Sequence, residues 1–294
     1  MKQILLIVNQ DSPENDCFLN AGKRQDVEVT LCPFDEILIT LNSGEPPRVV
    51  VQDRPLDPFD LVYFKTGVGA LETQHIISEQ CRLLDIPVFD KVFEHRRPFV
   101  EGKAFSAFKM LQAKLPLVNS LYLAKSKLTE NYSSLPFPRV VKPSNRSQGK
   151  DVFFYKTPGE LERDVHTFEE RVLIQPYIEN SGDVRIFVIG QEAVAAIKRV
   201  NRSGDFRHNM AQGAEASVHS PSQEEIDISL RAVEVLNYSI AGVDLIFDSA
   251  DQMWKIIEVN RAPLFKGLME TTGVDIPEKM VSFFKDQIKE TSKN

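Results

Sequence analysis

Short apolar runs separated by a helical pattern dominate the first third of the chain. Residues 2–9 (KQILLIVN), 27–32 (VEVTLC) and 60–65 (DLVYFK) each have the composition of a buried strand bounded by polar segments. Residues 71–85 repeat apolar side chains at helical spacing, and a short run at 87–90 (PVFD) follows them. Strands that alternate with helices in this way predict an open α/β sheet.

The middle of the chain follows a strand, turn, strand, helix, strand pattern. A helix is expected from Phe99 to Leu115, and a segment rich in serine and proline separates it from the next unit. From Arg139 two apolar runs flank a polar loop, a helix begins at Pro158, and residues 171–178 (RVLIQPYI) form another strand. This order predicts a compact α+β unit.

Two predicted hairpins and two helices occupy the last third of the chain. Residues 183–200 form two strands around a turn at IGQE, and a capping box at 222–225 begins a helix. The runs at 239–248 (SIAGVDLIFD) and 253–260 (MWKIIEVN) are separated only by SADQ, which predicts an antiparallel pair. A final helix is expected from Pro277.

Composition is typical of an ordinary folded protein and disfavours several classes. The 294 residues allow one large domain or two to three small ones. The net charge of −7, with a pI near 5.4, argues against nucleic acid as a partner. Three widely spaced cysteines, Cys17, Cys32 and Cys81, favour free thiols in a reducing cytoplasm over a zinc site or a disulfide framework. The apolar stretch at the N-terminus is too short for a signal or membrane segment, so no membrane partner is expected.

The last predicted strand ends in two polar residues, Glu258 and Asn260. Strict alternation places both on the face that carries Trp254 and Ile256, where a carboxylate needs a partner because an unpaired buried charge is costly. If the loop sets Asp244 opposite Glu258, three oxygen-bearing side chains share one face and suit a hard cation such as Mg²⁺, completed by substrate phosphates. A basic partner for one of them, with the others solvated, fits the hairpin equally well.

Two further segments have the composition of anion sites. Lys142 ends a β-branched strand and precedes a polar loop that contains Gly149. Such a loop lays backbone N–H groups over phosphate in some proteins, but the pattern also fits an exposed hairpin with a surface lysine. Residues 198–207 hold four basic side chains and one acid, which suits a phosphate or carboxylate but also fits a solvated loop.

Taken together and in this order, these motifs resemble the ATP-grasp superfamily, most closely its RimK-like glutamate-ligase branch. The resemblance covers roughly residues 103–280 and rests on VVKPSNRSQGKDV, LIQPYIENSGDVRIFVIGQEAVAAIKR, GDFRHNMAQGAEAS, AGVDLIF, EVN and ETTGVDI. It implies an ATP-grasp fold that mixes α/β and α+β structure. An N-terminal open α/β (pre-ATP-grasp) domain would span 1–97, and a small central lid domain with the phosphate loop 98–178. A C-terminal domain with an antiparallel sheet and the metal and substrate site would span 179–294.

The resemblance implies that ATP phosphates are held from two sides. Lys142 resembles the lysine that contacts the α- and β-phosphates in the family, and Lys103 resembles an earlier ATP-binding lysine. Ser147, Gln148 and Gly149 lie in the loop that would fold over the phosphates. These five residues would form the phosphate end of the nucleotide site.

The same resemblance implies where the nucleoside lies. Backbone groups around Gln175, Tyr177 and Ile178 resemble the hinge against which adenine is bound, and Asp183 resembles the residue that holds the ribose hydroxyls. The family commonly has an acidic residue where this chain has Pro176, which lacks a backbone N–H donor. Adenine contacts are therefore expected to differ slightly at this position.

The metal and the acceptor are assigned by resemblance to the C-terminal part. The expected magnesium ligands are Asp244, Glu258 and Asn260, and the γ-phosphate and acceptor carboxylate would be held by Arg199, Arg207 and Asn209. After the last metal ligand the branch typically continues with Ala-Ser-Pro-Gly, whereas this chain continues RAPLF over residues 261–265. This departure lies on the substrate side and predicts an acceptor of its own.

The implied activity is that of an ATP-dependent carboxylate–amine ligase using ATP with Mg²⁺ or Mn²⁺. A carboxylate on a peptide, a protein C-terminus or a small molecule would attack the γ-phosphate, and an amino acid such as glutamate would then displace phosphate. Two alternatives remain open, namely a kinase that phosphorylates a small-molecule hydroxyl on the same scaffold, and a non-catalytic nucleotide-binding protein. Because the family commonly assembles as oligomers, a homo-oligomer is also expected.

Overall fold

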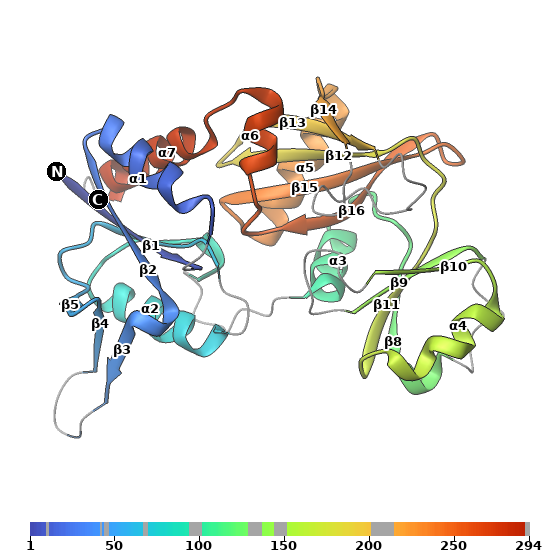
Figure 1. Cartoon of the computed structure of the whole chain (residues 1–294), viewed down its shortest axis with the longest axis horizontal. Coiled ribbons are helices and arrows are strands. Elements are labelled where there is room, and N and C mark those ends of the chain that lie inside the picture. Colours follow the sequence, from blue (N-terminus) through green and yellow to red (C-terminus); the bar gives the residue numbers. More distant parts are fainter. Residues whose placement is uncertain are drawn as a thin grey trace.

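The N-terminal part of the protein is a parallel four-stranded sheet. The structure is a computed structural model that describes residues 1–9, 12–41, 43, 47–66, 70–93, 102–128, 137–143, 152–200 and 215–291. The strand order is β2-β1-β6-β7, with β1 at Lys2–Val8, β2 at Val27–Pro33, β6 at Leu61–Phe64 and β7 at Val88–Phe89 (Figure 1). The open α/β sheet predicted for the first third is confirmed.

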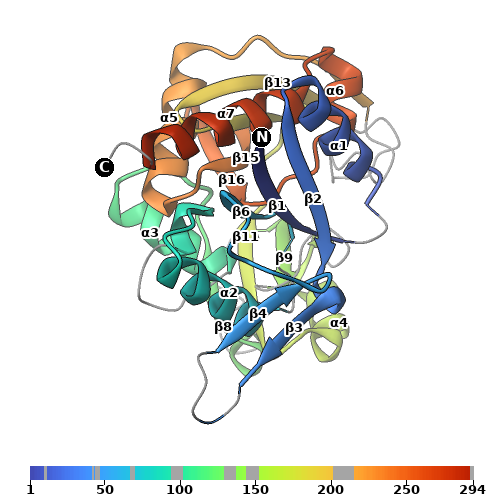
Figure 2. The same cartoon turned by 90° about the vertical axis from the view of Figure 1, so that its left-hand side faces the viewer.

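Two helices, α1 (Asn15–Arg24) and α2 (Leu71–Leu83), cover opposite sides of this sheet (Figure 2). Phe18 of α1 and Ile77 of α2 belong to two different core clusters, which take up alternate residues of β1. Both faces of β1 are therefore buried, which explains its continuous apolar run. A small antiparallel sheet that the sequence did not predict adjoins it, formed by β3 (Ile37–Thr40), β4 (Arg48–Val51) and β5 (Arg54–Pro55).

The central part is an antiparallel sheet in the order β10-β9-β11-β8. Its strands are β8 (Leu121–Ala124), β9 (Arg139–Pro143), β10 (Phe153–Tyr155) and β11 (Arg171–Pro176). The helix α4 (Pro158–Asp164) begins at the predicted proline, and its Leu161 packs in a separate small core with Val141 and Val172. The predicted strand, helix and strand order is confirmed, whereas β8 was not predicted.

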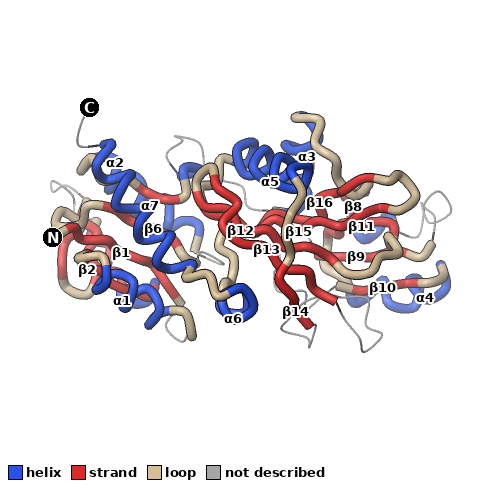
Figure 3. The backbone as a smooth tube through the Cα atoms, turned by 90° about the horizontal axis from the view of Figure 1, so that it is seen from above, coloured by secondary structure: helices blue, strands red, loops and turns tan. Residues whose placement is uncertain are grey.

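The C-terminal part is built on a five-stranded antiparallel sheet in the order β14-β13-β12-β15-β16. Its strands are β12 (Asp183–Ile189), β13 (Glu192–Val200), β14 (Glu215–Val218), β15 (Ile240–Asp248) and β16 (Met253–Asn260). Figure 3 shows α5 (Gln223–Leu236) and α6 (Lys266–Thr272) on opposite sides of this sheet, with α3 (Lys103–Gln112) beside α5. Both predicted hairpins are confirmed.

The predicted capping box at the start of α5 is also confirmed. The Ser222 hydroxyl accepts a hydrogen bond from the Glu225 amide at 3.4 Å, and the Glu225 carboxylate accepts one from the Ser222 amide at 2.8 Å. This reciprocal pair satisfies two of the amide donors that a helix start leaves without intrahelical partners. Four short 3-10 helices complete the described elements, at Phe34–Glu36, Lys91–Phe93, Lys125–Lys127 and Val165–Thr167.

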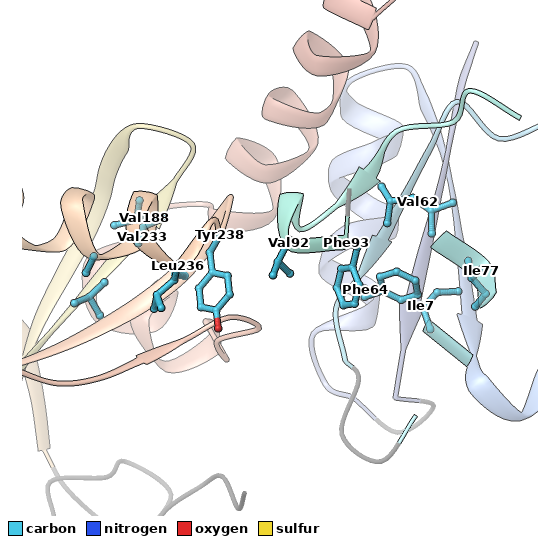
Figure 4. Packing of buried hydrophobic residues seen from close by; sticks show 14 of the residues in the cluster. Ile7, Val62, Phe64, Ile77, Val92, Phe93, Val188, Val233, Leu236 and Tyr238 are labelled. Atoms are coloured by element: carbon cyan, nitrogen blue, oxygen red, sulfur yellow. The ribbon is translucent and has the colours of Figure 1, made fainter. Parts of the chain in front are cut away.

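One apolar cluster connects the N-terminal sheet with the C-terminal sheet. Figure 4 shows Phe64 among the N-terminal members and Val188 among the C-terminal ones, with Val92 and Tyr238 lying between the two groups. Because these side chains form one contiguous core, the N-terminal and C-terminal parts pack against each other, through Val92 and Tyr238, which lie outside the strands. The charged face of the C-terminal sheet is thereby held at a fixed position relative to the N-terminal part.

The last helix, α7 (Ile276–Thr291), packs back onto the N-terminal sheet beside α1 (Figures 1 and 2). The ring centroid of Phe284 lies 5.1 Å from that of Tyr63 and 5.9 Å from that of Phe89. Helix α7 therefore completes the N-terminal core. The domain boundaries expected at residues 97 and 178 remain a prediction. No helix in the described part of the chain is both long and apolar enough to cross a membrane.

Candidate active site

The three predicted metal ligands lie on one face of the C-terminal sheet. In the register of β15 with β16, Asp244 pairs with Glu258, and Gly242 pairs with Asn260. Directly opposed residues of antiparallel strands project to the same side, so both carboxylates and the amide share a face. The Asn260 amide donates a hydrogen bond to Glu258 Oε1 at 3.0 Å. The predicted juxtaposition of Asp244 with Glu258 is confirmed.

The predicted face for Glu258 was wrong. The register shifts between Asp244 and Leu245, so that Glu258 pairs with the first and Ile256 with the second. One extra residue in β16, a β-bulge, moves every later side chain to the other face. Ile256 consequently lies in the apolar core, whereas Glu258 lies with Asp244 on the polar face.

Strands β12 and β13 add two arginines and an aspartate to this face. Arg185 pairs in register with Asp244, and its Nε and Nη2 each donate to a different carboxylate oxygen at 2.7 Å. Arg199 pairs with Asp183 in the same bidentate way at 2.7 and 2.8 Å, and its Nη2 also lies 3.2 Å from Asp244 Oδ1. The sequence reasoning missed Arg185, although alternation from Asp183 places it on the same face.

The electrostatics of Asp244 follow from these partners. Burial alone raises the pKa of this carboxyl, but the guanidinium groups of Arg185 and Arg199 outweigh burial and lower the pKa to about 2. The Asp244 side chain is buried, so it is charged in a place where only paired charges are tolerated. Asp244 is thus negatively charged at neutral pH and is flanked by the guanidinium groups of Arg185 and Arg199.

Two lysines approach the same cluster from other parts of the chain. Lys103, at the start of α3, lies 3.5 Å from Glu258, measured from Nζ to Oε2. Burial raises the pKa of Glu258, but the Lys103 ammonium and other neighbours lower it below its ordinary value. Lys142 on β9 is buried, and burial lowers its pKa while Glu258 acts in the opposite direction. Both lysines implied by the resemblance are therefore brought to the predicted metal ligands.

The donor set of the polar face fits a hard cation. Two carboxylates and one amide oxygen are the ligands that Mg²⁺ takes from proteins when substrate phosphates supply the rest. Among the described residues there is no group of three or more histidine, cysteine, aspartate or glutamate side chains arranged to hold a metal on its own. Asp244 and Glu258 therefore suit a metal that arrives with a phosphate ligand, which agrees with the surrounding lysines and arginines.

The predicted adenine hinge has its polar groups engaged within the chain. The Tyr177 amide donates to the Pro138 carbonyl at 2.9 Å, and the Ile178 carbonyl accepts from Asn180 at 2.8 Å. Gln175 is buried and donates from Nε2 to the Ser120 hydroxyl at 2.9 Å. The assignment of adenine to these residues, and of the ribose to Asp183, remains a prediction. Five predicted site residues, Ser147, Gln148, Gly149, Arg207 and Asn209, lie outside the described residues.

Comparison with known proteins identifies the family of this site. A family model described as the RimK-like ATP-grasp domain matches residues 105–284, which include β9, β15 and β16 with their charged side chains. The chain belongs to the RimK-like ATP-grasp family. The resemblance inferred from the motifs is confirmed, and so is the predicted ATP-grasp fold class, because solved ATP-grasp ligases share the fold.

Several curated relatives of this chain are named as glutamate ligases. A probable alpha-L-glutamate ligase of Azotobacter vinelandii is 25% identical over 283 residues, covering 91% of this chain and 89% of that protein. A ribosomal protein bS6–L-glutamate ligase of Salmonella paratyphi B is 36% identical over 153 residues, covering 50% of each chain. Against three probable alpha-L-glutamate ligases of Shewanella species, the match spans 52%, 63% and 52% of the relative. The chain thus spans about half to two thirds of the length of those relatives.

Solved structures extend the likeness over the whole chain. The ATP-grasp ligase PsnB, solved with a minimal precursor, Mg and ADP, has a TM-score of 0.71 at 16% identity over 97% of both chains. The D-alanine–D-alanine ligase of Bacillus anthracis has a TM-score of 0.67 at 15% identity, over 100% of this chain and 99% of that one. At these identities the likeness shows a shared fold.

Proposed function

We propose that this protein is an ATP-dependent carboxylate–amine ligase. A carboxylate oxygen of the acceptor attacks the γ-phosphorus of ATP, the bond to the β-phosphate oxygen breaks, and ADP leaves. The amine nitrogen of an amino acid such as glutamate then attacks the acylphosphate carbon, releasing phosphate and losing a proton to form an amide. The observation that carries this proposal is the pairing of Asp244 with Glu258 on one sheet face, framed by Lys103, Lys142 and Arg199.

The residues of the chain contribute positioning and charge rather than a covalent nucleophile. Lys142 and Lys103 neutralise the phosphates of ATP, and Arg199 with Arg185 balances the negative charge that develops on the transferred phosphoryl group. Arg207 and Asn209 are proposed to help Arg199 hold the γ-phosphate and the acceptor carboxylate, as the resemblance implies. Holding the reactants together in this way accounts for most of the rate gain in such reactions.

A divalent cation is part of the proposal. Asp244, Glu258 and Asn260 would hold Mg²⁺, or Mn²⁺ in its place, and the cation supplies Lewis-acid neutralisation of the β- and γ-phosphate oxygens when bound. Binding of ATP by Gln175, Tyr177, Ile178 and Asp183, and closure of the Ser147–Gly149 loop, remain proposals of the same kind. So do a cytoplasmic location, the expected homo-oligomer and a peptide, protein or small-molecule acceptor.

The decisive experiment measures ADP release and product mass together. The purified chain is incubated with MgATP and a panel of amino acids and peptides that begins with L-glutamate. A ligase gives ADP release that depends on the added amine, and a product whose mass equals the two substrates minus one water. A stable product heavier than one substrate by a phosphoryl group would instead identify a kinase. No ADP release with any pair, despite nucleotide binding, would favour the non-catalytic alternative.

A further inference from the structure

The segment that follows β16, the strand that carries Glu258 and Asn260, is anchored by a buried ion pair from the N-terminal part. Glu14 and Lys65 are both buried, and Lys65 Nζ lies 3.0 Å from Glu14 Oε2. Lys65 follows β6 directly, and Glu14 lies in the connection after β1. The carboxyl edge of a parallel sheet is where open α/β folds usually bind a ligand. Here this edge binds a segment of the same chain.

The anchored segment comprises residues 263–266. Lys65 Nζ donates a hydrogen bond to the Pro263 carbonyl at 3.1 Å, and its ammonium lies 5.3 Å from the Phe265 ring centroid. Glu14 Oε1 accepts hydrogen bonds from the amides of Phe265 and Lys266 at 2.5 and 2.9 Å. Two charged side chains thus bind three backbone groups, at Pro263, Phe265 and Lys266, around the start of α6.

The anchored segment reaches the polar face of the C-terminal sheet through Pro263. A Cβ placed on Gly242 would lie 3.0 Å from Pro263 Cβ and 3.7 Å from Arg185 Cδ. Gly242 pairs in register with Asn260 and lies two residues before Asp244. The proline ring and the side chain of Arg185, the residue that holds Asp244, therefore both lie next to Gly242. The position of the ring sets how much room remains next to that guanidinium.

A stabilising role does not explain why these charges are buried. Replacing a buried ion pair by apolar side chains of similar volume is often neutral or even favourable to stability, so such a pair is weak support for the fold itself. A pair that bonds three backbone groups does, however, fix a single arrangement of the segment. The geometry assigns this role, rather than stability, to Glu14 and Lys65.

We propose that Glu14 and Lys65 are positioning residues for the part of the active site that binds the amino-acid substrate. They hold residues 263–266 so that Pro263 bounds the space beside Arg185, while nucleotide and metal contacts are made by other residues. This inference rests on the proposed ligase function. It places specificity for the amino-acid substrate in the RAPLF segment, which the N-terminal part holds through Glu14 and Lys65.

The test uses the double variant Glu14→Leu/Lys65→Met, which removes both charges and the oxygen that accepts from the Phe265 and Lys266 amides, at similar volume, and avoids leaving either charge buried alone. The single variant Lys65→Met is measured beside it. The control is Arg24→Met, because Arg24 also joins the N-terminal part to a C-terminal segment, but its ion pairs are with Asp275 and Glu278 rather than with residues 263–266. All three are compared with the full wild-type chain.

Three quantities are measured, namely amide hydrogen exchange at Phe265 and Lys266, the Kd of Mg-ADP, and the KM values for L-glutamate and ATP. In the double variant we expect exchange at these two amides to rise about tenfold or more relative to amides of β1. The KM for L-glutamate rises about tenfold, while the KM for ATP and the Kd of Mg-ADP stay within about twofold. Arg24→Met changes none of them.

Unchanged exchange at Phe265 and Lys266 would overturn the proposal, and so would an equal rise in both KM values. If the wild-type chain releases no ADP with L-glutamate, that result counts against the proposed substrate and not against the positioning role. Amide hydrogen exchange at Phe265 and Lys266 and the Kd of Mg-ADP then decide whether Glu14 and Lys65 have the positioning role. Faster exchange with unchanged nucleotide affinity supports positioning, whereas a parallel loss of nucleotide affinity contradicts it.

Discussion

Arg185 holds both carboxylate oxygens of Asp244, with two N–O distances of 2.7 Å. Arg199 approaches the same carboxylate from the next strand at 3.2 Å. Among the described side chains of this face and its two lysine neighbours, there are four cations and three carboxylates. The cations are Lys103, Lys142, Arg185 and Arg199, and the carboxylates are Asp183, Asp244 and Glu258. The site therefore carries surplus positive charge, which suits a polyphosphate better than a bare metal ion.

Metal affinity is expected to depend on nucleotide. Without phosphate, a divalent cation must displace Arg185 and Arg199 from Asp244, whereas nucleotide phosphates offer those arginines another anion and give the cation further oxygen ligands. We expect Mn²⁺, followed by electron paramagnetic resonance, to bind at least about tenfold more tightly with saturating ADP than without it.

The matched variant for this coupling is Arg185→Met. Removing this guanidinium frees one side of Asp244, so Mn²⁺ alone should bind more tightly than it does to the wild-type chain, and the gain from ADP should shrink. Lys255→Met serves as the control because Lys255 pairs with Asp248 at the opposite end of the same hairpin. Equal Mn²⁺ affinity with and without ADP in the wild-type chain would contradict the coupling.

Glu258→Gln is expected to abolish turnover while leaving the fold intact. The amide retains an oxygen to accept from Asn260 but loses the negative charge that attracts Lys103 and a metal. We expect ADP release to fall about a hundredfold or more, because the lost carboxylate would hold the cation that neutralises charge at the reacting phosphates. The control Asp248→Asn removes a carboxylate at the far end of the hairpin and should leave the rate unchanged. Near-normal turnover in Glu258→Gln would remove this residue from the metal site.

Acid should weaken the fold through Asp244. Its pKa is lowered from 3.8 to about 2, so the charged form stabilises the folded state above about pH 4, and this contribution disappears as the pH falls from 4 to 2. Relative to Asp244→Asn, which cannot titrate, the wild-type chain should lose roughly 2 kcal/mol of unfolding free energy over this range. Urea titrations from pH 5 downward measure the difference. A gap between the two proteins that is constant with pH would contradict this assignment.

The sequence predicted the strands of the site better than its faces. The short SADQ loop and the apolar runs on either side determine the hairpin and its register from Asp248 with Met253 to Leu245 with Ile256. The bulge then sets Asp244 opposite Glu258. The bulge beyond Ile256 left no comparable signal, because one extra residue in a strand changes neither its composition nor its length noticeably. Strict alternation from Trp254 therefore gave the wrong face for Glu258.

Contacts between distant segments could not be predicted in this way. Lys65 and Pro263 are 198 residues apart in sequence, and neither lies in a motif that indicates a partner. Arg185 was within reach of sequence reasoning, since it alternates with Asp183, but a single arginine in an apolar strand has many possible partners. The motifs thus predicted which residue types would meet, whereas the packing of the N-terminal part against RAPLF required the structure.

A glycine next to the polar face should prove essential to its backbone. Gly182 immediately precedes Asp183 and has φ +123°, and a Cβ there would lie 2.4 Å from the Arg199 carbonyl oxygen. Gly182→Ala should therefore lower the unfolding free energy by at least about 1–3 kcal/mol, because backbone strain adds to the clash. Gly159, near the start of α4, has no atom within 4 Å of such a Cβ, so Gly159→Ala should be neutral or stabilising by up to about 1 kcal/mol. Urea titrations measure the unfolding free energies of the two variants. Equal values would show that the close contact of the Arg199 carbonyl with residue 182 does not require glycine there.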